Sequence, residues 1–173
     1  MKDYDFRTDV LPLKDELYRL ALRITLNRAE AEDVVQETLL KVWNRRESWG
    51  EIESMDAFCL KICRNQSLDV VRRRQGGIID DNGEAADEPP DTSSAADPAR
   101  LTESRDRLDL VRRIIDRLPE KQRVCMQMRD IEGHSYREIA ITLDITEQQV
   151  KVNIFRARQF VRQQFTETEH YGL

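Results

Sequence analysis

Apolar positions recur every three or four residues along most of this chain, which is the spacing of one face of an α-helix. Helix-starting residues, such as Pro12 and the Asn27-x-x-Glu30 pattern, precede several of these runs. No segment shows the convincing alternation of a half-buried strand, so the pattern predicts an all-α fold. The predicted helices cover approximately residues 12–24, 27–45, 54–74, 101–117, 119–131, 135–143 and 146–165.

The helical pattern stops in the segment QGGIIDDNGEAADEPPDTSSAADPA, residues 75–99. Gly-Gly, Pro-Pro and Ser-Ser pairs interrupt it, and neither a helical nor a strand period remains. We therefore expect a flexible acidic linker over 75–100 that joins two small helical domains, one over 1–74 and one over 101–173.

Charge is distributed unevenly along the 173 residues, whose formal net charge is −5. Residues 1–74 hold 14 basic and 14 acidic side chains, whereas residues 75–99 hold seven acidic side chains and no basic one. Residues 100–165 hold 14 basic against 10 acidic side chains. The acidic linker thus masks a basic C-terminal part, and the net charge does not exclude a nucleic-acid partner.

The remaining composition argues against a membrane protein and against an enzyme. The chain has no run of eighteen apolar residues, and its N-terminus lacks the apolar core of a signal peptide, so we expect a cytoplasmic protein with reduced thiols and no direct membrane insertion. Cys59 and Cys63 share one helical face and are expected to be core residues; a redox or metal switch is the alternative. With His134 and His170 as the only histidines, no zinc spacing, nucleophile–base pair or phosphate-binding glycine loop is found, and no cofactor or metal is expected.

Two helix-capping patterns stand eleven residues apart near the C-terminal end. Ser135 and Thr146 each have Glu or Gln three residues further on, as in a capping box. Between them, Ala140 is small enough for two helices to cross closely, and Asp144 stands at the turn, where a left-handed conformation is needed. Val150 supplies the expected buried position, and the stretch therefore predicts a helix-turn-helix.

The second helix of this motif separates an apolar face from a cationic one. The apolar positions are Val150, Ile154, Ala157 and Val161. The adjacent face holds Lys151, Phe155, Arg158 and Arg162, with Val152, Arg156 and Gln159 beside them. A cationic face on a capped helix suits docking in the major groove of DNA; the alternative is an arginine-rich surface helix of an ordinary hairpin.

Two further surfaces in the first half allow more than one interpretation. Leu40 lies among the carboxylates on the polar side of the 28–45 helix; the pattern alone favours an ordinary exposed leucine, and the alternative is an anchor for a basic helical partner. The third helix carries Lys61, Arg64, Asn65, Arg72, Arg73 and Arg74. With Trp49 and Phe58 nearby, these could bind a nucleic-acid single strand, or they could form a solvated helix end.

Three blocks of the sequence, in this order, resemble bacterial sigma factors of the extracytoplasmic-function group in the sigma-70 family. They are AEDVVQETLLKVW (31–43), AFCLKICRNQSLDVVRRR (57–74) and LPEKQRVCMQMRDIEGHSYREIAITLDITEQQVKVNIFRAR (118–158). The resemblance implies sigma domain two, a linker and sigma domain four, in a protein that binds core RNA polymerase and directs it to promoter DNA.

The resemblance also implies roles for particular residues. Those matching the helix that docks on core polymerase are Asp33, Gln36, Glu37 and Leu40, which reverses the preference stated above for Leu40. Those matching the segment that recognises and opens the −10 element are Lys61, Arg64, Asn65, Asp69, Arg72 and Arg73. Those matching the helix that reads the −35 element are Lys151, Val152, Phe155, Arg156 and Arg158.

The family further implies an anti-sigma factor as a partner, and a linker that threads toward the polymerase active-site channel and RNA exit path, although a plain solvated tether remains an alternative. This chain departs from the family pattern at Asp144, where glycine is usual, and at Gln148, Gln149 and Val152 near the start of the recognition helix. The promoter sequence therefore does not follow from the resemblance. A stand-alone helix-turn-helix repressor or activator is the competing function, but it leaves the two N-terminal blocks unexplained.

Overall fold

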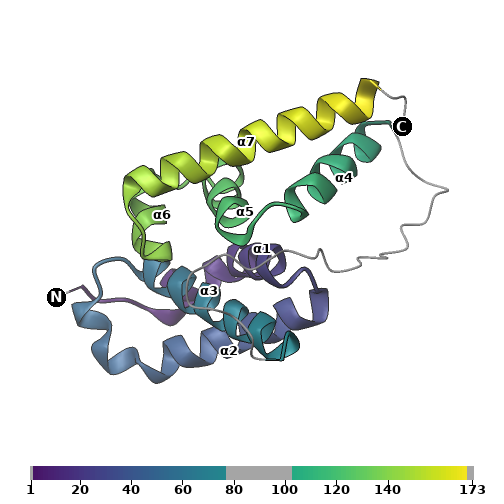
Figure 1. The fold of residues 1–173 in the computed structure, drawn as a ribbon. Helices are drawn as coiled ribbons and strands as arrows, with labels where there is room; N and C mark the ends of the chain where they lie inside the picture. Colours follow the sequence, from purple (N-terminus) through teal and green to yellow (C-terminus); the bar gives the residue numbers. More distant parts are fainter. Residues whose placement is uncertain (1, 77–102, 171–173) are drawn as a thin grey trace.

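The computed structural model describes residues 2–76 and 103–170, and within these ranges the chain is helical, without strands (Figure 1). Residues 77–102, which hold most of the expected linker, lie outside the described residues. The helices of the first half are η1 (Phe6–Val10), η2 (Leu11–Leu13), α1 (Lys14–Thr25), α2 (Arg28–Asn44), η3 (Arg46–Glu51) and α3 (Met55–Arg74). Those of the second half are α4 (Glu103–Asp116), α5 (Glu120–Met126), η5 (Gln127–Ile131), α6 (Tyr136–Leu143) and α7 (Glu147–His170).

Side-chain caps set the starts of α2 and α3. Asn27 Oδ1 accepts a hydrogen bond from the Glu30 amide at 3.0 Å, and Ser54 Oγ accepts one from the Ala57 amide at 3.3 Å. The C-terminal end of α1 is set by Leu26, which takes the left-handed conformation at φ 55°. The predicted helices of the first half are thus confirmed. The first begins two residues later than expected, at Lys14, because Pro12 lies in the 3-10 turn η2 that precedes α1.

The second half differs from the expectation in two places. The helix predicted over 119–131 is divided, because α5 ends at Met126 and the chain continues as the π-helical turn η5. The last helix extends to His170, about one turn beyond the predicted end, and α4 lies alongside it in Figure 1. A small core at this contact contains Ile115, Leu118 and Ala157.

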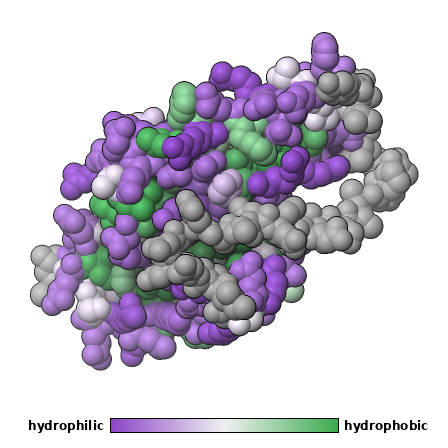
Figure 2. Space-filling view, in the orientation of Figure 1, coloured by the Kyte–Doolittle hydropathy of each residue, from purple (hydrophilic) through white to green (hydrophobic). Residues whose placement is uncertain are grey.

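The two halves do not stand apart. The lower layer of Figure 1 holds α1, α2 and α3, and the upper layer holds α4 to α7. Buried side chains from both layers form one continuous cluster, which includes Leu17 and Leu60 below and Val124, Met128 and Ile139 above. The contacts across the boundary join α1 to α5 and η5, and α3 to α6. In the face that Figure 2 shows, hydrophilic residues dominate and hydrophobic ones form separate patches.

The cysteines are core residues, which confirms the prediction for Cys59 and Cys63 and adds Cys125. Cys59, Cys63 and Cys125 are all buried and form no disulfide. Burial raises the pKa of each thiol to about 12, so the reactive thiolate is scarce at neutral pH.

The turn of the helix-turn-helix provides a test of the fold. Asp144 has φ 56°, and a side chain without a local hydrogen-bonding group pays a steric penalty of about 1–2 kcal/mol there. We expect Asp144→Ala to lower the free energy of unfolding by about 1 kcal/mol and Asp144→Gly to leave it unchanged or raise it. Chemical denaturation of the full chain measures both.

Gln148→Ala, at an exposed position on α7, is the matched control and should change stability little. Equal stabilities of Asp144→Ala and Asp144→Gly would show that the left-handed turn is not required.

Candidate functional site

The helix-turn-helix in the second half is built by reciprocal caps. Ser135 Oγ accepts from the Glu138 amide at 3.1 Å, and Glu138 Oε2 accepts from the Ser135 amide at 2.8 Å. The same pair of bonds joins Thr146 and Gln149, at 2.9 and 3.1 Å. Both predicted capping boxes are therefore present, and they set the starts of α6 and α7.

The faces of α7 lie as the sequence predicted. Val150, Ile154 and Ala157 are buried against the rest of the second half, and Val161 is partly buried. Of the residues expected at the −35 element, Lys151, Phe155, Arg156 and Arg158 are exposed, and Val152 is half-buried. Phe155 is 61% exposed and is available for apolar contact with a partner.

Two side chains of this face are held by residues outside α7. Arg158 donates from Nε and Nη2 to the two carboxylate oxygens of Asp130 at 3.0 and 2.5 Å. The ammonium group of Lys151 lies 5.5 Å from the ring centre of Tyr136, and the guanidinium of Arg129 lies 4.4 Å from the same ring. Sequence reasoning missed Asp130, Tyr136 and Arg129 as parts of this surface, since only the packing of η5 and α6 on α7 brings them there.

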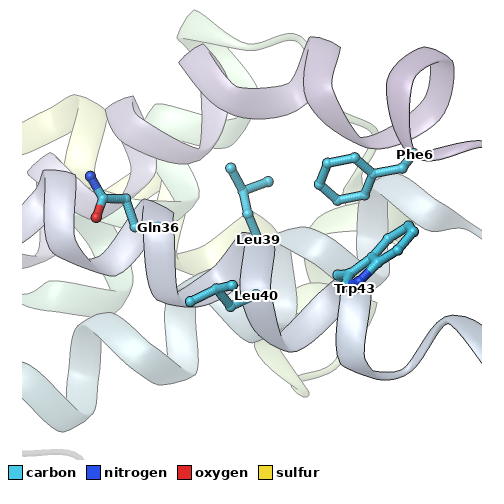
Figure 3. A pocket seen from close by; sticks show the side chains of 5 residues that line it. All are labelled: Phe6, Gln36, Leu39, Leu40 and Trp43. Atoms are coloured by element: carbon cyan, nitrogen blue, oxygen red, sulfur yellow. The ribbon is translucent and has the colours of Figure 1, made fainter.

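An apolar groove lies on the outer face of α2 and encloses about 530 Å³ (Figure 3). Phe6, Gln36, Leu39, Leu40 and Trp43 line it. Leu40 is 58% exposed, and Asp33 and Glu37 on the same helix are exposed as well. All four residues expected to dock on polymerase therefore lie on exposed positions of one helix, with an apolar floor and acidic neighbours.

Phe6 belongs to this groove although it is distant in sequence. Its ring meets Trp43 edge-on at 5.4 Å and lies parallel to Trp49 at 6.4 Å. No periodic signal marks Phe6, because its ring meets Trp43 of α2 only in the tertiary structure, where η1 packs on α3. Trp49, named above as an aromatic near the basic residues of α3, is not available to a nucleic-acid strand, because its side chain is buried and its Nε1 donates to the Val42 carbonyl at 3.1 Å. Phe58 is half-buried against the core.

The basic residues of α3 are not equally available. Lys61, Asn65, Arg72 and Arg73 are exposed, and Asp69 lies 3.6 Å from Arg72. Arg74 is occupied, because its Nη2 donates to Glu30 and to the Thr25 carbonyl, both at 2.7 Å. The side chain of Arg64 is 13% exposed, and its Nε lies 3.8 Å from Oε1 of Glu120 on α5.

Three further ion pairs cross between the halves, all from α1. Arg23 binds Asp116 at 2.7 Å, and Arg19 binds Glu132 through two hydrogen bonds of 2.6 and 3.0 Å. Partial burial opposes ionisation of Glu132, but the hydrogen bond and charge of Arg19 lower its pKa. His134 binds Glu16 of α1, and this hydrogen bond raises the pKa of the imidazole against the opposing effect of burial.

Within residues 2–76 and 103–170, no group of three or more His, Cys, Asp or Glu side chains could hold a metal ion. None of the helices in these ranges has the length and apolar composition needed to cross a bilayer.

Comparison with known families divides the chain as the structure does. The model described as Sigma-70 region 2 matches residues 10–76, and the model described as Sigma-70, region 4 matches residues 108–161. Among curated relatives, the ECF RNA polymerase sigma factor SigE of Mycolicibacterium smegmatis is 36% identical over 151 residues, which are 86% of this chain and 56% of SigE. SigL of Mycobacterium tuberculosis is 34% identical, over 84% of this chain and 80% of SigL.

A solved structure shares the fold. It is the sigma factor RpoE in complex with the anti-sigma factor NepR from Bartonella quintana, with a TM-score of 0.70 and 23% identity. The match covers 94% of this chain and 97% of that one.

The ion pair of His134 makes the contact between the halves dependent on pH. Glu16 on α1 and Glu138 on α6 face the imidazole, and Asp56 on α3 and Glu132 also carry charge near it. Because the pKa is raised in the folded protein, the stabilisation is complete below the unfolded value of 6.5 and is lost as the pH rises through the folded pKa. We expect the free energy of unfolding to fall over that interval.

An NMR titration of His134 in wild type and in Glu16→Gln measures this. The Glu16→Gln substitution should lower the His134 pKa and flatten the pH dependence of stability. An unchanged His134 pKa in this variant would contradict the contact.

Proposed function

The chain belongs to the extracytoplasmic-function sigma factors of the sigma-70 family, and on this premise we propose that it binds core RNA polymerase and directs it to promoters. In this proposal domain two (1–74) docks on polymerase and recognises the −10 element, and domain four (101–173) reads the −35 element. Residues 75–100 join them. The catalytic chemistry of transcription then belongs to polymerase, and this chain supplies position and specificity.

The observation that carries the proposal is the groove on α2. An exposed leucine in an apolar groove with carboxylates around it matches the needs of a helical partner that has an apolar ridge and basic flanks. Leu40 supplies the anchor, and Asp33 and Glu37 supply complementary charge at the rim. A stand-alone repressor has no use for this surface, and the family match over residues 10–76 does not favour that alternative.

The promoter contacts are proposed for two separate faces. On α3, Lys61, Asn65, Arg72 and Arg73 are exposed and suited to phosphate and base contacts, with Asp69 beside them. On α7, Lys151, Arg156 and Arg158 supply charge, while Phe155 and Val152 supply apolar contact with bases. The excess of basic residues in the second half supports the proposed DNA contact of α7.

Arg64 can contact the −10 element with these residues only after it separates from Glu120 of α5. Its guanidinium lies in the boundary between the halves, where Arg64 Nε and Glu120 Oε1 are both buried without a hydrogen-bond partner. At 3.8 Å the two groups are too far apart for a good hydrogen bond, so their attraction offsets little of the desolvation cost of burying both charges. Nucleic-acid phosphates could therefore compete with Glu120 for the arginine. We propose that α3 and α5 separate when the chain binds a promoter.

An anti-sigma factor is the remaining proposed partner. The support is the shared fold with RpoE, which was solved with NepR bound. A partner that covers the groove on α2 or the cationic face of α7 would block polymerase or DNA, respectively.

The docking face can be tested by run-off transcription from a promoter library with purified core polymerase. We expect transcription to require this chain and Leu40→Asp to abolish most of it, because a charge replaces the apolar anchor at the centre of the groove. Polymerase binding should weaken by about 2 kcal/mol or more.

Leu108→Asp is the matched control, since Leu108 is 57% exposed on α4, far from the groove. Both variants should fold as wild type does. If Leu108→Asp reduces transcription as much as Leu40→Asp, or if the chain represses promoters without polymerase, the proposed function fails.

The release of Arg64 gives a second test on single-stranded DNA. Glu120→Gln should raise the affinity for a −10 non-template oligonucleotide about two- to fivefold, because it removes the competing charge. Arg64→Gln should lower it. Fluorescence anisotropy of the full chain bound to core polymerase measures both.

Asp109→Asn, which removes a carboxylate paired with Arg112 on α4, controls for net charge. Equal gains in affinity from Glu120→Gln and Asp109→Asn would show that Arg64 is not specifically restrained.

A further inference from the structure

We propose that Asp130 and Tyr136 are positioning residues for promoter reading: Asp130 orients Arg158 and Tyr136 orients Lys151, although neither lies on α7. The proposal rests on the proposed function of α7 as the −35 reader and adds residues that determine its specificity.

The pair of Asp130 and Arg158 fixes the plane of the guanidinium. Two parallel hydrogen bonds, from Nε and Nη2, leave the arginine little freedom to rotate, unlike a single contact. These two hydrogen bonds occupy the edge of the guanidinium formed by Nε and one hydrogen of Nη2. The other end, formed by Nη1 and the second hydrogen of Nη2, is not used in this pair, and the side chain is 45% exposed.

The free end of the guanidinium has the geometry of a specific reader. Two neighbouring N–H groups can donate to O6 and N7 of a guanine in the major groove, or to two phosphate oxygens. An arginine that is already oriented loses less conformational entropy when it binds. An unrestrained arginine could donate to many different bases and phosphates. By orienting the guanidinium, Asp130 favours the one that Arg158 can reach in that orientation.

Tyr136 acts on the other end of the same face. Its ring has the guanidinium of Arg129 at 4.4 Å and the ammonium of Lys151 at 5.5 Å, both within the range of a cation–π contact. Arg129 is itself anchored, because its Nη1 donates to the His134 carbonyl at 2.9 Å. The ring is thus fixed from η5 and draws Lys151 toward it.

The two oriented cations have a defined separation. Lys151 and Arg158 are seven residues apart, about two helical turns, so they project from one side of α7 about 10 Å apart. That distance corresponds to about three base steps along one strand. Residues of η5 and α6 thereby set the register in which α7 meets the groove.

Asp130 also has an electrostatic effect on binding in general. A carboxylate beside a DNA-facing arginine cancels part of its charge and repels phosphates. The expected consequence is weaker affinity for arbitrary sequences and stronger discrimination among them. If the ion pair of Asp130 and Arg158 only joined η5 to α7, its removal would change the stability of the protein and leave its discrimination among DNA sequences unchanged.

The experiment uses holoenzyme made from the full chain and core polymerase. A −35 element is first selected from a random library, and duplexes with each of its base pairs changed then measure discrimination. Asp130→Asn should reduce discrimination at one or two adjacent base pairs about tenfold. It should also raise affinity for an unrelated duplex and steepen its salt dependence by up to about one counterion.

Three variants control the interpretation. Glu147→Gln removes an exposed carboxylate from the first turn of α7 and should change only general affinity. Tyr136→Phe keeps the ring and should keep discrimination, whereas Tyr136→Leu should lose it at the base pair nearest Lys151. Thermal unfolding of each variant identifies any that are destabilised.

The outcomes separate the proposals. If wild-type holoenzyme prefers no −35 sequence, the proposed function of α7 fails. If wild type discriminates and Asp130→Asn discriminates equally at every base pair, the positioning role is overturned. A uniform loss of affinity for all duplexes, with a lowered melting temperature, would also overturn it.

Discussion

The burial of α1 on two sides is the constraint from which the arrangement of this protein follows. Toward α2 and α3 the helix presents Leu17, Leu20 and Ile24, all buried. Toward the second half it presents the charged residues that pair with α4, with Glu132 directly after η5, and with the turn before α6. Because one short helix serves both contacts, its orientation constrains where α5 and η5 lie, while α3 contacts α6. Together these contacts set the direction of α7, which packs on α5 and α6.

The apolar contact supplies most of the energy at this boundary, and the ion pairs supply its register. Partly exposed ion pairs contribute about 0–1 kcal/mol each, whereas burial of a single large apolar side chain contributes about 1.5–3 kcal/mol. The buried cluster that includes Leu60, Met128 and Ile139 therefore outweighs Arg19, Arg23 and His134 together. Opposite charges across the boundary instead disfavour any shifted packing, since a shift of one helical turn would leave them unpaired.

Several arginines that a sequence would assign to DNA contacts are engaged within the protein. Arg64 meets Glu120, Arg74 meets Glu30, and Arg158 meets Asp130. The three arginines differ in how available they are for a DNA contact. Arg74 also donates to a backbone carbonyl, and Arg64 is nearly buried, whereas Arg158 retains an exposed end. A count of basic residues therefore overstates the charge that is free to meet a phosphate.

The helical elements, their caps and their buried faces follow from the sequence alone, because these depend on neighbours three or four residues away. Ser135, Asp144 and Val150 were assigned correctly for that reason, and so was the exposed position of Leu40. Three features depend instead on how the helices pack: Phe6 reaches the groove on α2, Trp49 is buried, and Asp130 and Tyr136 lie beside α7. Those contacts join residues whose separation in the chain carries no periodic signal, and they form only when packing of the cores fixes one helix against another.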